Sequence, residues 1–264
     1  MSLCHKIIIC LVAVWSCVAA EEGDRAAALF DAGLYDQAEP LYLKELQQPD
    51  SDASHIRLQL GQLYIATQQY PKVLEILNDI EDPWAIYLKA VAHARLQQDE
   101  KALDLFHQYL KSSDPSSYKE ETLFEMALIH FQQKKYMESL KELTAIHTSN
   151  TRLQFLVNIY RARISLAQHR YQEAITTLSP LAKKVPEEDP LHFEVNALLG
   201  EAYFLSHEYA QAIPYLKKSS PPTVAREIFL VLPFPLSTGM LLHPHPSNGI
   251  GRICVEKAPQ HIEK

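Results

Sequence analysis

A fixed spacing of small and large apolar residues recurs along this chain and constrains its fold more than any other feature. The two clearest copies are Leu60-Gly61-x-x-Tyr64 with Tyr70-x-x-Val73-x-x-x-Leu77, and Leu199-Gly200-x-x-Tyr203 with Tyr209-x-x-Ala212-x-x-x-Leu216. Weaker copies lie at Tyr35-x-x-Ala38-x-x-x-Tyr42, Ala102-x-x-x-Phe106, Tyr136-x-x-Ser139-x-x-x-Leu143 and Tyr171-x-x-Ala174-x-x-x-Leu178. Their steps cluster near the ~34-residue period of stacked helix pairs. The sequence therefore predicts a repeat array, in which each repeat packs mainly on its neighbours.

Each repeat is expected to hold two helices, because apolar residues recur at three and four positions along it. Short polar turns such as Gln68-Gln69 separate the two helices of a pair. Proline-containing breaks such as Asp82-Pro83 separate successive repeats. With only 7 glycines and most of the 16 prolines in such breaks or near the C-terminus, the composition favours an all-α fold without strands.

This pattern resembles the tetratricopeptide repeat family over about residues 24–222. Small residues that would let paired helices approach closely are Gly61, Ala90, Ala127, Ala162 and Gly200 on first helices, and Ala38, Ala102, Ala174 and Ala212 on second helices. Large residues that would wedge against the next repeat are Tyr42, Leu77, Phe106, Leu143, Leu178 and Leu216. The resemblance implies a right-handed α-solenoid of about six helix-turn-helix repeats within residues 21–222.

The chain departs from the family pattern at three places. Val73 and Ser139 replace the second small residue, and Asp99 lies where tyrosine is usual. Only 29 residues separate Val73 from Ala102. The third repeat is therefore expected to have a shortened entry or a shifted first helix.

Residues 1–20 are typical of a secretory signal peptide. Lys6 supplies a positive start, residues 7–18 an apolar segment, and residues 18–20 a small-residue cleavage site. The apolar segment is shorter than the ~20 residues that span a bilayer, which disfavours a permanent anchor. Together with the lack of an Asn-x-Ser/Thr sequon, this predicts export to a bacterial envelope or periplasm. In the alternative, Cys17 is lipidated and tethers the protein to a membrane.

The C-terminal part of the sequence loses the repeat pattern. Residues 223–232 are expected to form a capping helix over the last repeat, with Thr223 as N-cap and Pro233 as its end. Residues 233–264 show no usable period and are rich in proline and glycine. They are either a natural irregular tail or the remnant of a truncation or frame change in a longer array.

No pattern typical of catalysis occurs in the sequence. Phosphate-binding glycine loops, nucleophile elbows and zinc-protease motifs are absent, so we expect a non-enzymatic protein without a cofactor. The close pair His243 and His245 is interpreted as a coincidence rather than a metal site. The net charge of −7 is spread along the chain without basic clusters, which argues against nucleic-acid binding.

The resemblance identifies the concave face as the candidate binding surface. First-helix residues expected to line it are Leu58, Gln62, Ile65, Tyr87, Val91, Phe124, Leu128, Phe131, Ile159, Arg163, Leu166, Glu194, Glu201 and Phe204. This lining is apolar and aromatic, and it lacks the Lys, Arg and Asn cluster with which some family members grip a peptide's C-terminal carboxylate. In the alternative interpretation, several of these residues belong to the core between repeats.

The sequence thus favours a protein-interaction scaffold of the bacterial envelope, which binds a peptide segment or a partner subunit, with self-association as a further expectation. The alternative is an envelope-assembly lipoprotein, or a non-catalytic specificity subunit of a larger enzyme complex, held by Cys17.

Overall fold

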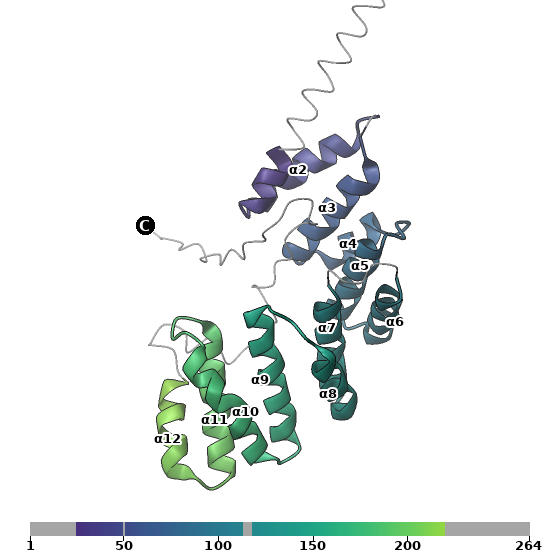
Figure 1. Cartoon of the computed structure of the whole chain (residues 1–264). Coiled ribbons are helices and arrows are strands. Elements are labelled where there is room, and N and C mark those ends of the chain that lie inside the picture. The colour runs from purple at the N-terminus through teal and green to yellow at the C-terminus, as the bar shows by residue number, and fades with distance from the viewer. Residues whose placement is uncertain (1–24, 50, 113–117, 220–264) are drawn as a thin grey trace, which may run out of the picture. The chain divides into compact units, whose positions relative to one another are not determined.

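The structure is a computed structural model that describes residues 25–49, 51–112 and 118–219 (Figure 1). Residues 25–31 are helical, and they precede eleven further helices in these ranges. These are α2 (Tyr35–Leu46), α3 (Ala53–Ala66), α4 (Tyr70–Ile76), α5 (Pro83–Arg95), α6 (Asp99–Leu110), α7 (Lys119–Gln132), α8 (Tyr136–Ala145), α9 (Thr151–Ala167), α10 (Tyr171–Lys184), α11 (Pro190–Leu205) and α12 (Tyr209–Lys218). The described residues contain no strand, which confirms the predicted all-α helical-repeat fold.

The helices divide into two compact units, at residues 25–112 and 118–219. Within each unit, a first helix packs on the second helix of its own repeat, as α3 does on α4 and α11 on α12. That second helix then packs on the first helix of the next repeat, as α10 does on α11. This nearest-neighbour packing is the arrangement expected of a repeat array.

Acidic and amide side chains begin four of the first helices. Asp52, Asp82, Asn150 and Asp189 each accept a hydrogen bond from a backbone N–H in the first turn of α3, α5, α9 and α11 respectively. Such caps satisfy N–H groups that have no partner within the helix. The residue type just before a first helix therefore helps to set where that helix begins.

The turn between the paired helices has the same backbone geometry in all six pairs of the described residues. Its central residue has a positive φ of 58–73°, at Gly33, Gln68, Gln97, Lys134, His169 and His207. In the second repeat, the Gln69 N–H donates to the Tyr64 carbonyl at 2.8 Å and the Gln68 N–H to the Ile65 carbonyl at 3.1 Å. This is the hydrogen-bond pattern of a Schellman motif. Equivalent bonds recur at the other five turns, so the same local motif connects the two helices of every described pair.

The small residues named from the sequence are buried between the paired helices. Gly61 shows how close the approach is, since a Cβ atom added there would lie 2.8 Å from Leu77 Cδ1. Ser139 is tolerated at a position that is usually alanine because its hydroxyl donates to the Ala127 carbonyl at 2.8 Å. A buried hydroxyl that makes a hydrogen bond avoids most of its desolvation cost.

The short interval before the third repeat comes from the helix that precedes it. Helix α4 has 7 residues, whereas α8 has 10 and α10 has 14. The paired small residues Ala90 and Ala102 keep the same twelve-residue separation as Gly61 and Val73. Of the two alternatives, the structure therefore shows the shortened entry, with an intact turn inside the third repeat.

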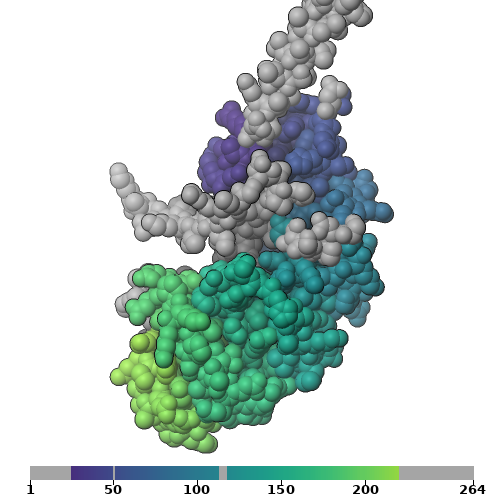
Figure 2. All heavy atoms as spheres, viewed as in Figure 1, coloured from purple at the N-terminus to yellow at the C-terminus, as the bar shows by residue number. Residues whose placement is uncertain are grey.

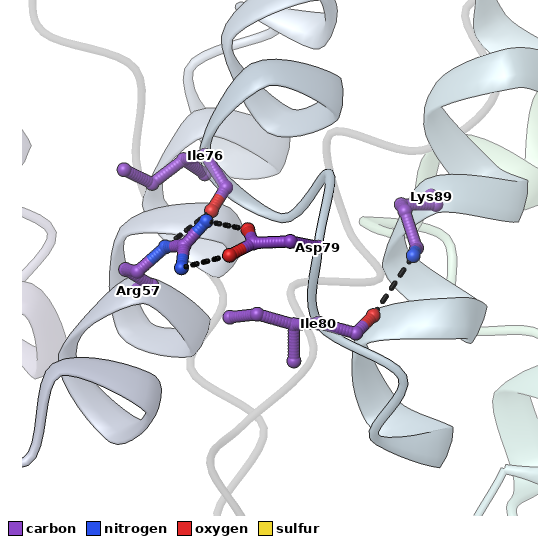
Figure 3. Close-up of polar contacts among 5 residues, drawn as sticks. All are labelled: Arg57, Ile76, Asp79, Ile80 and Lys89. Carbon is purple, nitrogen blue, oxygen red and sulfur yellow. Dashed lines mark hydrogen bonds and ion pairs between the residues drawn. The ribbon is translucent and has the colours of Figure 1, made fainter.

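Two cationic side chains hold the short connection between α4 and α5 (Figure 3). Arg57 of α3 donates from Nε to the Ile76 carbonyl at 2.7 Å and forms an ion pair with Asp79. Lys89 of α5 donates from Nζ to the Ile80 carbonyl at 2.9 Å. The arginine lowers the pKa of Asp79, and burial lowers the pKa of Lys89. These bonds give partners to one carbonyl at the end of α4 and to one in the connection that follows it.

The predicted signal peptide (1–20), the capping helix (223–232) and the tail (233–264) lie outside the described residues. Among the residues that are described, no helix is both long and apolar enough to cross a membrane.

Candidate functional site

The first helices form a layer of their own in each unit. Helix α3 contacts α5, and α9 contacts both α7 and α11. Second helices of neighbouring repeats make no comparable contact in the described part of the chain. The first helices of each unit therefore lie closer to one another than its second helices do.

An aromatic cluster joins the first helices of the second unit. The Tyr160 ring of α9 lies 5.6 Å from the ring of Phe124 and 5.4 Å from that of Phe131, both on α7, in edge-on arrangements. Arg163, one turn further along α9, places its guanidinium 5.7 Å from the Tyr160 ring centroid. Edge-on ring pairs and cation–π contacts of this kind contribute beyond their buried area.

Arg163 also connects this cluster to the last repeat. Its Nη2 and Nε donate to Glu194 Oε1 of α11 at 2.7 and 3.1 Å. A second ion pair joins Arg152 Nη1 of α9 to Oδ2 of Asp189, the N-cap residue of α11, at 2.9 Å. Arg163 is the one predicted site residue with a permanent positive charge, and its partner is an acid of this chain. The described face therefore does not offer a cationic cluster for a peptide carboxylate.

Two half-buried acids have shifted pKa values in the second unit. Burial raises the pKa of Glu142, while its 2.9 Å contact with His130 opposes that shift. Burial also raises the pKa of Glu121. The pair His130 and Glu142 links α7 to α8 inside one repeat, so its geometry fits a packing role.

Seven of the predicted lining residues are buried, and a partner could not contact them in this conformation. They are Gln62, Tyr87, Val91, Phe124, Leu128, Ile159 and Leu166. They pack between helices, as the alternative interpretation of the sequence anticipated. The reason is geometric: in a closely packed first-helix layer, one helical step separates a lining position from a core position.

The remaining predicted residues stay accessible to different degrees. Leu58, Ile65, Phe131 and Arg163 are half-buried, whereas Phe204 is 53% exposed. The Phe131 ring packs on the rings of Tyr136 and Tyr160, with centroid distances of 5.9 and 5.4 Å. Phe131 is therefore partly a core residue and partly a surface residue. Of the aromatic residues expected on this face in the second unit, Phe204 is exposed and Phe131 is half-buried.

Phe204 lies on a defined face of α11. Glu194, Ala197 and Glu201 precede it at intervals of ten, seven and three residues, so all four share one side of the helix. Glu194 forms the ion pair with Arg163 of α9, so this side of α11 faces α9. We call these four residues with Arg163 the α11 face. In Figure 2 the green atoms of α11 and the yellow-green atoms of α12 lie at one end of the second unit.

Tyr160 is the contact residue that the sequence interpretation missed. It joins Phe124, Phe131 and Arg163, although it is itself buried. Its position three residues before Arg163 on the same helix was the available signal.

The first unit has a shallow open depression of about 750 Å³ that the sequence did not predict. It lies along α5 and α6, and is lined by Glu81, Pro83, Ile86, Asp104, His107, Gln108, Lys111 and Ser112. Its lining carries charged groups of both signs, Glu81, Asp104 and Lys111, beside the apolar side chains of Pro83 and Ile86.

No group of three or more His, Cys, Asp or Glu side chains within the described ranges could hold a metal ion. His243 and His245, considered above as a metal pair, and Cys17, the lipidation candidate, lie outside those ranges.

Comparisons with known proteins find a family match over part of the chain. The tetratricopeptide repeat family model matches residues 160–222. No curated protein matches the chain. Several solved structures resemble it at low identity, which shows the fold alone. A tetratricopeptide repeat protein from Parabacteroides merdae ATCC 43184 aligns with a TM-score of 0.58 and 16% identity, covering 77% of this chain and 80% of that one.

Two further structures have the same fold. The Cut9–Hcn1 hetero-tetramer of APC/C aligns with a TM-score of 0.55 and 16% identity, over 74% of this chain and 38% of that chain. A MamA structure, MSR-1 C2, aligns with a TM-score of 0.51 and 16% identity, over 63% of this chain and 94% of that one. The likeness extends beyond residues 160–222, in agreement with the repeat pattern across the whole described region.

Proposed function

Because the chain carries tetratricopeptide repeats, we propose that it is a non-enzymatic scaffold that binds a segment of a partner protein on the α11 face. Proteins with these repeats generally mediate protein–protein interactions. The observation that carries the proposal is the 53% exposure of Phe204 on the first-helix side of the second unit. Large aromatic side chains dominate binding energy at interfaces, and most of the other predicted aromatics are already used in packing.

The chemistry of the α11 face suggests the kind of segment it takes. Phe204 offers an apolar contact, and the exposed Glu201 lies one turn before it. Arg163 is neutralised by Glu194, so the face has a net acidic character. A segment with an apolar side chain next to a lysine or arginine would complement both features.

The test compares three variants of the full chain against a partner that crosslinking has first identified. Phe204→Ala is expected to weaken binding by about 1–3 kcal/mol while the melting temperature stays near that of the wild type. Met137→Ala is the matched control, because Met137 is exposed on a second helix, α8. Phe124→Ala should instead lower stability, by roughly 3–5 kcal/mol, because that ring is buried in the core.

Two results would contradict the proposal. One is binding that Phe204→Ala leaves unchanged, and the other is an equal loss for Phe204→Ala and Met137→Ala. The first would remove the α11 face from the interaction, and the second would remove its specificity.

Location in a bacterial envelope is part of the same proposal and is supported by the signal-like residues 1–20. A reporter fused after Glu22 is expected to reach the envelope, and the mature chain to begin at Glu21. A mature N-terminus at a diacylglyceryl Cys17 would favour the alternative, a membrane-tethered assembly protein or specificity subunit. A cytosolic protein that retains Met1 would contradict both.

A further inference from the structure

The open depression along α5 and α6 lies at a position that an arginine of this chain occupies one repeat earlier. In the second repeat, Arg57 of α3 lies four residues before the buried Gly61. In the third repeat, Ile86 of α5 lies four residues before the buried Ala90, and its side chain lines the depression. A shorter, uncharged side chain thus takes the place of a guanidinium group.

The position of the carboxylate that pairs with this arginine also belongs to the depression. Arg57 Nη1 donates to Asp79 Oδ2 at 3.2 Å, and Asp79 lies six residues after Val73 of α4 (Figure 3). Gln108 lies six residues after Ala102 of α6, and its side chain lines the depression. At these two equivalent positions, the third repeat therefore has neither the guanidinium nor its carboxylate.

Carboxylates elsewhere in the lining can accept hydrogen bonds from a cation. Glu81 precedes α5 and Asp104 lies on α6, and both are exposed. Within the described ranges, the Asp104 side chain has no hydrogen-bond or ion-pair partner. Helix α6 continues to Leu110, so the acceptors here are side chains, whereas Arg57 also uses a backbone carbonyl at the end of α4. Because Lys111 is the one lysine or arginine of the lining, its carboxylates outnumber its permanent positive charges.

The size and the apolar part of the depression fit a long cationic side chain. Its volume of about 750 Å³ leaves room for an arginine side chain and the backbone that carries it. Pro83 and Ile86 provide apolar surface for the methylene stem, while the charged end stays near the carboxylates. A guanidinium has five donors in a planar fork, which matches the geometry of a carboxylate better than an ammonium does.

We propose that the depression along α5 and α6 binds an arginine side chain of a partner peptide, whose guanidinium takes the position that Arg57 has in the second repeat. Glu81 and Asp104 accept hydrogen bonds from the guanidinium, and Ile86 packs against its stem. This site belongs to the first unit, whereas the α11 face belongs to the second. The experiments below therefore do not depend on the function proposed for the α11 face.

An NMR titration of the full chain tests the site with two small probes, N-acetyl-L-arginine methylamide and its neutral citrulline counterpart. The arginine probe should cause saturable shifts of the backbone amides of residues 104–112. It should bind at least about 5-fold more tightly than the citrulline probe, because hydrogen bonds between charged groups are the stronger ones. Equal affinities for the two probes, or shifts by arginine that do not saturate, would overturn the proposal.

Variants of the full chain locate the binding within the depression. Asp104→Asn should weaken the arginine probe about 3- to 10-fold, because it removes the charge of one acceptor. Asp36→Asn makes the same change at an exposed position of α2 and should alter the affinity less than about 2-fold, since no contact is lost. Ile86→Arg should abolish the shifts, because the chain's own guanidinium then fills the site. Equal effects of the two Asp→Asn changes, or wild-type affinity in Ile86→Arg, would contradict the assignment.

Discussion

Glycine at the turns between paired helices should stabilise this protein. Gln68 and Gln97 have φ values of 59° and 58°, in the left-handed region, and both side chains are exposed. For residues other than glycine this conformation costs roughly 1–2 kcal/mol. Glycine avoids that cost but loses about 0.5–1 kcal/mol more conformational freedom on folding. The net gain is therefore about 0.5–1 kcal/mol at each turn.

Both turns lie in the first unit, far enough apart in the sequence to belong to different repeats, so their effects should add. The double variant Gln68→Gly with Gln97→Gly is expected to raise the free energy of unfolding of that unit by about 1–2 kcal/mol. Urea denaturation followed by circular dichroism measures this change, because the midpoint should rise while the slope stays constant.

Two controls separate the turn from glycine itself. Lys101→Gly, at an exposed position inside α6, should destabilise by about 1 kcal/mol, because helix interiors disfavour glycine. Gly33→Gln, at the one such turn that already has glycine, should also destabilise. If the double variant is no more stable than the wild type, the positive φ at these turns does not destabilise the folded state, and the prediction is refuted.

Three further predictions concern packing and charge in the first unit. Gly61→Ala should destabilise by about 1 kcal/mol in the same denaturation assay, since its Cβ would lie 2.8 Å from a fully buried leucine methyl and overpacking outweighs the helix propensity gained. Arg57→Ala should cost about 1.5–3 kcal/mol because it removes a charged hydrogen bond to the Ile76 carbonyl. Asp79→Asn should change stability little, because the Asp79 side chain is 69% exposed. Equal losses of stability for Arg57→Ala and Asp79→Asn would refute this prediction. Burial, aided by a hydrogen bond to a glutamate, raises the pKa of Tyr64 to about 12. The folded state therefore favours the neutral phenol, and the stability that this contributes should be complete below about pH 10 and decline toward about pH 12. Tyr64→Phe should flatten that decline in denaturation curves taken from pH 8 to 11, and an unchanged slope would contradict the assignment.

The repeat architecture could be read from the sequence because it depends on local patterns. Helix periodicity and the small residues at fixed spacing, such as Gly61 and Ala102, act within a repeat or between neighbours. Leu77 and Leu178 were named from spacing alone, and both are fully buried. The sequence pattern of a repeat array therefore predicts its core residues, because their contacts are made within a repeat or between neighbouring repeats.

The accessible surface was decided by the tertiary structure. Tyr87, Phe124 and Phe204 all lie on first helices, yet two of them are core residues and one is exposed. Their spacing could not separate these outcomes, since exposure depends on how closely neighbouring helices pack and on whether another helix follows. Leu216 illustrates the second point: it shares the sequence position of Leu178, but in the described residues no helix follows α12 to cover it. A sequence specifies which side chains can form a core, whereas the neighbours present in three dimensions determine which of them remain available to bind.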